Sequence, residues 1–158
     1  MTASLVVRAA SAADAPAIVT LVNRAFAIEK AFVDGERTSP EEIRQLLQKG
    51  MFLLADGEDG APVACAYVEQ RGYRAYLGML SVDPVCQGRG LGRQMMDAVE
   101  QHCRGHRVRA LDIRILSLRP ELPPFYRRLG FVEEGTAPYA NPLATRPGHF
   151  ILMSKNLT

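Results

Sequence analysis

The stretch that decides the fold is Leu80-Ser81-Val82-Asp83-Pro84-Val85-Cys86-Gln87-Gly88-Arg89-Gly90-Leu91-Gly92-Arg93. It begins inside an apolar segment, residues 75–82, and leads into residues 91–105, where apolar side chains recur at helical spacing. The stretch therefore predicts a Gly-rich turn between a buried strand and the amino terminus of an amphipathic helix. Unpaired main-chain N–H groups, the helix dipole and the two arginines favour an anion there, and the glycines let a phosphate approach the main chain. A pyrophosphate is a ligand of suitable size.

Two common phosphate-binding loops do not fit this turn. A Walker loop ends in Gly-Lys-Ser/Thr, whereas Gly92 is followed by an arginine. A dinucleotide fingerprint aligned on Gly88 and Gly90 needs a third glycine where Arg93 stands, and it follows the first strand of its unit, whereas this loop lies in mid-chain. The pattern that remains is Gln-x-x-Gly-x-Gly, formed by Gln87, Gly90 and Gly92.

Short strands and helices alternate along the rest of the chain. Strands are expected at residues 5–8, 51–55, 62–68, 75–82, 109–116, 131–136 and 150–157. Helices are expected after Asp14, after the capping box Ser39-Pro40-Glu41-Glu42, from Leu91 to about Gly105 and at residues 123–129. The order β-α-α-β-β-β-α-β-α-β-β places a parallel pair at the centre and antiparallel hairpins on both sides. It predicts one α/β (α+β) domain over residues 1–158 with a mixed, centrally parallel sheet.

Composition excludes several classes of protein. Lys+Arg 19 against Asp+Glu 17 gives a net charge of +2, too small for a nucleic-acid module or a binder of anionic membranes. No apolar run approaches the ~18 residues of a membrane span, and Met1-Thr2-Ala3-Ser4 opens neither a signal peptide nor a myristoylation site. Three cysteines argue against a disulfide framework. We therefore expect a soluble cytoplasmic domain.

Two features suggest metal binding or a nucleophile, and we expect neither. His102, Cys103 and His106 have metal-ligand character but lack a fourth ligand at a suitable spacing, so we predict no metal site. They fit the end of a helix, where histidine favours the negative pole of the dipole. Cys86 lies in the turn without an adjacent base, and we interpret it as a spacer and not as a nucleophile.

The turn resembles the coenzyme A loop of the GNAT superfamily of acyl-CoA-dependent N-acyltransferases. Further on, Phe125-Tyr126-Arg127-Arg128-Leu129-Gly130-Phe131 resembles the second signature of that family, and the element order matches as well. The resemblance thus covers nearly the whole chain. It implies a splayed sheet of six to seven strands flanked by about four helices, and an acetyl-CoA-dependent N-acetyltransferase.

The resemblance also implies residue roles. Main-chain amides of the loop would hold the pyrophosphate, and the strand before it would pair with pantetheine as if the cofactor were another strand. The implied cofactor-binding residues are Leu80, Ser81, Val82, Gln87, Gly88, Arg89, Gly90, Leu91, Gly92, Arg93, Ser117, Arg119 and Tyr126. A main-chain N–H near Met79 or Leu80 would stabilise the oxyanion, and Tyr126 would protonate the departing thiolate. Transfer would be direct, in a ternary complex.

Two positions depart from the family pattern. Arg119 stands where many members carry an asparagine that contacts the cofactor, so that contact is replaced by Arg119 or Ser117, or lost. The strand at residues 75–82 contains no acid, although many members use a glutamate there as the base. Glu69, Glu29 and His149 are the candidate bases, and a water chain is the alternative.

The amine acceptor, a small molecule or a peptide, is expected near the loop that joins the last two strands. Candidate acceptor-site residues are Glu29, Tyr139, Asn141, Arg146 and His149. A rigid, Pro-clamped surface loop is the alternative. Glu29, Glu36 and Glu41 would favour a cationic acceptor, or they form an exposed acidic turn. A donor longer than acetyl, a homodimer and a non-catalytic CoA-binding sensor remain alternatives.

Overall fold

The computed structural model describes residues 5–158, so Met1-Thr2-Ala3-Ser4, on which the expectation about leader sequences rests, lies outside the described residues. The strands are β1 (Val7–Ala9), β2 (Met51–Asp56), β3 (Pro62–Arg71), β4 (Arg74–Val82), β5 (Ala110–Leu116), β6 (Val132–Pro138) and β7 (His149–Asn156). The helices are α1 (Ala15–Ala25), α2 (Pro40–Lys49), α3 (Leu91–Gly105) and α4 (Leu122–Arg128), with short 3-10 helices η1 (Ala12–Asp14), η2 (Ala27–Ala31) and η3 (Pro84–Cys86). The predicted element order is confirmed. Within residues 5–158, none of the helices combines the length and apolarity that crossing a membrane requires.

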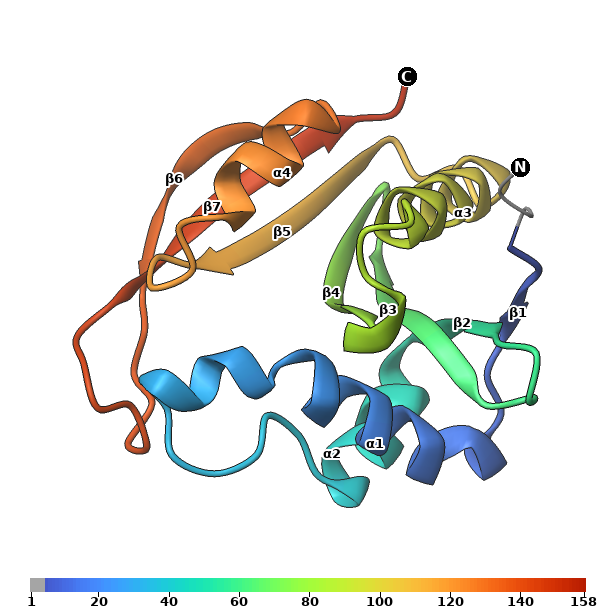
Figure 1. Cartoon of the computed structure of the whole chain (residues 1–158). Helices are drawn as coiled ribbons and strands as arrows, with labels where there is room; N and C mark the ends of the chain where they lie inside the picture. Colours follow the sequence, from blue (N-terminus) through green and yellow to red (C-terminus); the bar gives the residue numbers. More distant parts are fainter. Residues whose placement is uncertain (1–4) are drawn as a thin grey trace.

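The strands form one seven-stranded sheet in the order β1-β2-β3-β4-β5-β7-β6. Only β4 and β5 pair in parallel, and every other neighbouring pair is antiparallel. The parallel pairing joins residues 74–76 to residues 110–112 and then stops, so that the two strands diverge toward their carboxyl ends (Figure 1). The mixed, centrally parallel and splayed sheet is thus confirmed.

Helices cover both faces of the sheet. Helices α1 and α2 pack on one face around Ile18, Ile43 and Phe52, whereas α3 and α4 pack on the other around Met95, Val99 and Phe131 (Figure 1). Only half of the predicted capping box of α2 forms. The Ser39 hydroxyl accepts a hydrogen bond from the Glu42 N–H, but the Glu42 carboxylate accepts from the Thr38 hydroxyl.

A β-bulge interrupts β4 just before the Gly-rich turn. Cys65 of β3 lies opposite Ser81 and Tyr67 lies opposite Gly78, so β4 carries one extra residue between these pairs. Met79 within the bulge has a φ of +50°, which is uncommon for a residue other than glycine. Leu77 faces α3 and α4, Met79 faces α1 and α2, and Leu80 again packs toward α3 and α4. The bulge therefore changes which side chains of β4 face each of the two helical layers.

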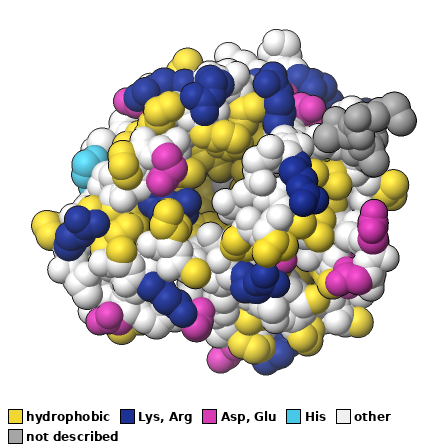
Figure 2. Space-filling model, viewed as in Figure 1, with side chains coloured by type: hydrophobic (Ala, Val, Ile, Leu, Met, Phe, Trp, Pro, Cys, Tyr) yellow, Lys and Arg dark blue, Asp and Glu magenta, His cyan; other side chains and the backbone are white. Residues whose placement is uncertain are grey.

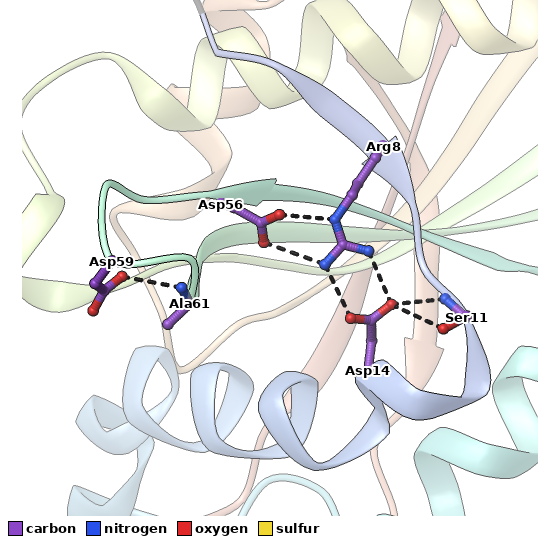
Figure 3. Close-up of polar contacts among 6 residues, drawn as sticks. All are labelled: Arg8, Ser11, Asp14, Asp56, Asp59 and Ala61. Carbon is purple, nitrogen blue, oxygen red and sulfur yellow. Dashed lines mark hydrogen bonds and ion pairs between the residues drawn. The ribbon is translucent and has the colours of Figure 1, made fainter.

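An arginine at the start of the sheet ties three elements together. The Arg8 guanidinium of β1 donates to Asp56 at the end of β2 and to Asp14, the residue that precedes α1 (Figure 3). Asp14 also accepts from the Ser11 N–H at 2.8 Å. The hydrogen bonds from Arg8, supported by the one from Ser11, lower the pKa of Asp14 to about 2.

This cluster predicts a specific response to acid. In the unfolded chain Asp14 titrates near its ordinary value of about 3.9, so its ion pair stabilises the fold above that pH and ceases to do so as the pH falls toward 2. Carbon-13 NMR of the carboxyl group should give a midpoint near pH 2 in the native protein and a higher one in Arg8→Gln. Arg44→Gln, which removes an exposed arginine of α2, is the control and should leave the midpoint unchanged. A native midpoint near pH 4 would contradict the assignment.

Candidate active site

The divergence of β4 and β5 opens a cavity of about 1080 Å³. Its walls include the main chain and side chains of residues 76–80 of β4 and residues 113–116 of β5. Figure 2 shows the hollow in the surface, with hydrophobic side chains inside it and Lys and Arg side chains around it. The cavity extends from the turn before α3 to the loop between β6 and β7, so it brings together segments far apart in the sequence.

The Gly-rich turn lies at one end of this cavity. Gly88 and Gly90 have φ values of +83° and +76°, which explains why glycine occupies both positions. A Cβ atom at either position would meet nothing within 4 Å, so the surface of the turn is open to a ligand. Gly90 is the N-cap of α3, and the first N–H groups of this helix therefore lie at the turn. The turn residues that line the cavity are Gln87, Gly88, Gly90, Leu91, Gly92 and Arg93.

The edge of β4 that faces β5 supplies main-chain donors. Beyond Tyr76 this edge has no strand partner among residues 5–158, because β5 pairs with β7 along its whole length instead. Leu80 and Val82 line the cavity, as the resemblance implies. Ser81 does not, because it is buried and its hydroxyl donates to the Met79 carbonyl at 2.9 Å. Ser81 thus stabilises the bulge.

Tyr126 of α4 is buried, and it borders the cavity. Its ring contacts Phe125 and Phe131 edge-to-face, with centroids 5.1 and 5.5 Å away. Burial raises the pKa of Tyr126 above its ordinary value, and the nearby Arg119 opposes this only in part. The hydroxyl therefore keeps its proton at neutral pH.

Arg119 forms a half-buried ion pair across the cavity. Its guanidinium contacts Glu29 of η2 at 3.1 Å and Glu121 at 3.3 Å, and the side chains of Arg119 and Glu29 are each 14% exposed. The two residues are 90 positions apart in the chain. Arg119 thus connects the segment after β5 to the segment after α1 and donates to one carboxylate from each side.

The structure places several predicted site residues away from the cavity. Glu69 was a candidate base, but its carboxylate accepts hydrogen bonds from the Tyr67 hydroxyl at 2.7 Å and from Arg71 at 2.6 Å. Both bonds lower the pKa of Glu69, and the bond from Tyr67 has the larger effect. The carboxylate is therefore a weaker base. Ser117 and His149 bind each other, since the His149 N–H donates to the Ser117 hydroxyl at 2.9 Å. The predicted site residues outside the cavity lining are Glu69, Ser81, Arg89, Ser117, Arg146 and His149.

The loop between β6 and β7 borders the far end of the cavity through Tyr139 and Asn141. Asn141 accepts from the Leu143 N–H and donates to the Tyr139 hydroxyl, both at 3.0 Å. The same loop is bound to the segment after η2, because Val33 and Ala144 form an antiparallel bridge. This loop is therefore clamped to a neighbouring segment and also forms a wall of the cavity.

Three contributors to the site were not predicted. The bulge at Met79 had a weak signal in Gly78, since glycine inside a strand often marks a bulge. Tyr76 and Arg114 line the cavity from the face of the sheet opposite α3 and α4. In the sequence, alternation along residues 110–116 gives Arg114 the pattern of a solvent-exposed side chain, so nothing distinguished it.

Because Glu29 and Arg119 form an ion pair, substitutions at the two residues should have non-additive effects on the free energy of unfolding. Arg119→Met leaves Glu29 half-buried without a cation and should lower the free energy of unfolding by about 1–3 kcal/mol. Glu29→Gln should cost less, because Arg119 retains Glu121. Urea denaturation of both single variants and the double variant measures the coupling, which should make the double loss smaller than the sum. Strict additivity would mean that the pair contributes no interaction energy.

Comparison with known proteins agrees with this geometry. A family model described as an acetyltransferase (GNAT) domain matches residues 19–145. The chain is 32% identical over 106 residues to serotonin N-acetyltransferase 2, chloroplastic, of Oryza sativa subsp. japonica; the match covers 64% of this chain and about half, 52%, of that protein. The ribosomal-protein-S18-alanine N-acetyltransferase of Escherichia coli shares the fold, with a TM-score of 0.82, 18% identity and coverage of 97% and 94%. A phosphinothricin acetyltransferase of Sinorhizobium meliloti in complex with AcCoA also shares it, with a TM-score of 0.78, 18% identity and coverage of 98% and 89%. The chain belongs to the GNAT acetyltransferase family.

Proposed function

We propose that the protein transfers the acetyl group of acetyl-CoA directly to a primary amine of a small molecule or peptide, with both substrates bound at once. The observation that carries this proposal is the single cavity that joins the turn before α3, the unpaired edge of β4 and the hydroxyl-bearing ring of Tyr126. An elongated thioester needs these three features in one continuous space. The complex of the Sinorhizobium meliloti enzyme with AcCoA supports the same cofactor here.

The residues present suit the anionic end of acetyl-CoA. The N–H groups at the start of α3 and the glycines of the turn suit a pyrophosphate. Arg93 and Arg128 also line the cavity, and neither forms an ion pair with a carboxylate among the described residues. These two cations can therefore offset phosphate charge. Pantetheine would then follow the edge of β4 from Val82 toward Leu80.

Catalysis then requires an oxyanion donor and an acid. Main-chain N–H groups at the bulge of β4, near Met79 and Leu80, would stabilise the oxyanion that forms when the amine attacks the thioester carbonyl. When this intermediate collapses, the C–S bond breaks and Tyr126 donates its proton to the thiolate sulfur. Burial keeps Tyr126 protonated before the step, and it disfavours a charged thiolate in the same cavity as well, so the proton passes to the sulfur as the C–S bond breaks.

The proton of the amine leaves without a dedicated base. Of the candidate bases, only Glu29 lines the cavity, and its carboxylate is engaged by the Arg119 guanidinium. Water in the cavity is the acceptor we infer. Turnover should therefore rise with pH up to the pKa of the acceptor amine itself.

Calorimetry with acetyl-CoA, followed by thiol release over a panel of amines, tests the proposal. Binding with turnover on an amine is the expected result. Binding without turnover on any amine would favour a CoA-binding sensor, and an absence of binding would overturn the assignment of the turn. Gly90→Val should weaken binding strongly, since it strains a left-handed residue and puts a side chain where the phosphate lies.

Tyr126→Phe tests the acid. The phenylalanine keeps the contacts with Phe125 and Phe131, so turnover should fall by about 10²-fold with little change in acetyl-CoA affinity. Tyr73→Phe is the control, because Tyr73 is exposed and does not line this cavity. Unchanged turnover in Tyr126→Phe would remove this residue from the mechanism.

A further inference from the structure

The acidic side chains of the cavity are all compensated. Glu29 and Glu121 pair with Arg119, Glu36 pairs with Lys30 at 3.0 Å, and Glu42 pairs with Arg37 at 3.8 Å. Glu41 does not line the cavity at all. The expected acidic attraction for a cationic acceptor is therefore cancelled within the protein, and the uncompensated charges that remain in the cavity are positive.

Arg114 is the uncompensated cation farthest from the phosphate end. It lies in the middle of β5, and its guanidinium packs over the rings of Phe150, at 4.8 Å from the centroid, and Tyr76, at 5.8 Å. Among residues 5–158 it forms no ion pair. The nearest acid on the same strand face, Asp112, is engaged by the guanidinium of Arg74. Two rings thus hold Arg114 in place while its N–H donors stay available.

Arg114 also lies close to the reaction centre. The ring of Tyr76 lies next to both Arg114 and the bulge of β4. The Arg114 guanidinium packs over this ring, and a Cβ atom on Gly78 would be 3.0 Å from it. Arg114 and Gly78 beside the bulge therefore share one aromatic neighbour, and both residues line the cavity.

We propose that Arg114 binds an anionic group of the acceptor, so that the substrates of this enzyme are amines carrying a carboxylate or a phosphoryl-type anion a few bonds from the nitrogen, as in a free amino acid. A planar guanidinium held by rings suits such oxyanions, which it can bind through two parallel hydrogen bonds. A polyamine, in contrast, would place a second positive charge against Arg114. This inference rests on the proposed acetyl transfer and adds the class of acceptor to it.

Matched substrate pairs test the inference. Acetyl transfer is measured for a panel of L-amino acids and, beside each, its C-terminal amide, with spermidine as a polycationic amine. Amidation removes the anion and also makes the amine less basic, which by itself favours the amide in a reaction that needs a neutral amine. We expect kcat/KM for the best acid to exceed that for its amide by about tenfold or more.

The variants assign that preference to Arg114. In Arg114→Gln the ratio of acid to amide should fall to one or below through a higher KM for the acid, and Arg114→Lys should restore part of the preference for the acid. The control is Arg109→Gln, because Arg109 packs over Tyr73 at 4.8 Å in the same manner but outside this cavity. It should keep the wild-type ratio.

The outcomes separate this inference from the proposed function. Transfer to spermidine or to amides that equals or exceeds transfer to acids would overturn the acceptor class and leave the acetyltransferase standing. A preference for acids that survives in Arg114→Gln would overturn the role of Arg114. Acetyl-CoA binding with no transfer to any amine would overturn both proposals.

Discussion

The parallel pairing of β4 with β5 ends after three residue pairs, and the rest of the site depends on that interruption. The last of these pairs joins Tyr76 of β4 to Asp112 of β5. Beyond it, β5 remains bound to β7 and runs away from β4, which leaves one edge of β4 without a partner. An unpaired edge is normally a site of unwanted association. Here it lies along a cavity that residues of α1, α4 and the loop between β6 and β7 also line, so its main-chain donors are available to a ligand.

The chain maintains this opening with local devices on both sides. On β4, the bulge at Met79 is stabilised by the Ser81 hydroxyl, and the ring of Tyr76 lies against Gly78, where a Cβ atom would come within 3.0 Å of it. Across the opening, Arg119 and Glu29 form a half-buried ion pair that joins the two halves of the sheet through their loops. If β4 and β5 stayed paired along their length, the cavity would close. The bulge of β4, the ring of Tyr76 and the ion pair between Arg119 and Glu29 together keep it open.

Hydrophobic periodicity and turn chemistry were sufficient to predict the order of all the main elements, the mixed sheet and the turn before α3, because each of these depends on neighbours in the sequence. Features that depend on distant residues could not be predicted. Glu29 pairs with Arg119 across 90 positions, and the sequence around either residue gives no sign of this pairing. Glu69 was a reasonable base by position, but Tyr67 and Arg71 occupy its carboxylate. Arg114 had no distinguishing signal, since its surroundings come from β4 and β7.

The proposed function requires that a single ligand spans the turn before α3 and the open edge of β4. Titration of the nitrogen-15-labelled protein with acetyl-CoA, followed by main-chain amide NMR, tests it directly. The amides of Gly88, Gly90 and Leu80 should shift together with one dissociation constant, while those of β1 and β6 stay in place. Shifts confined to the turn, or to surfaces outside the cavity, would contradict the claim.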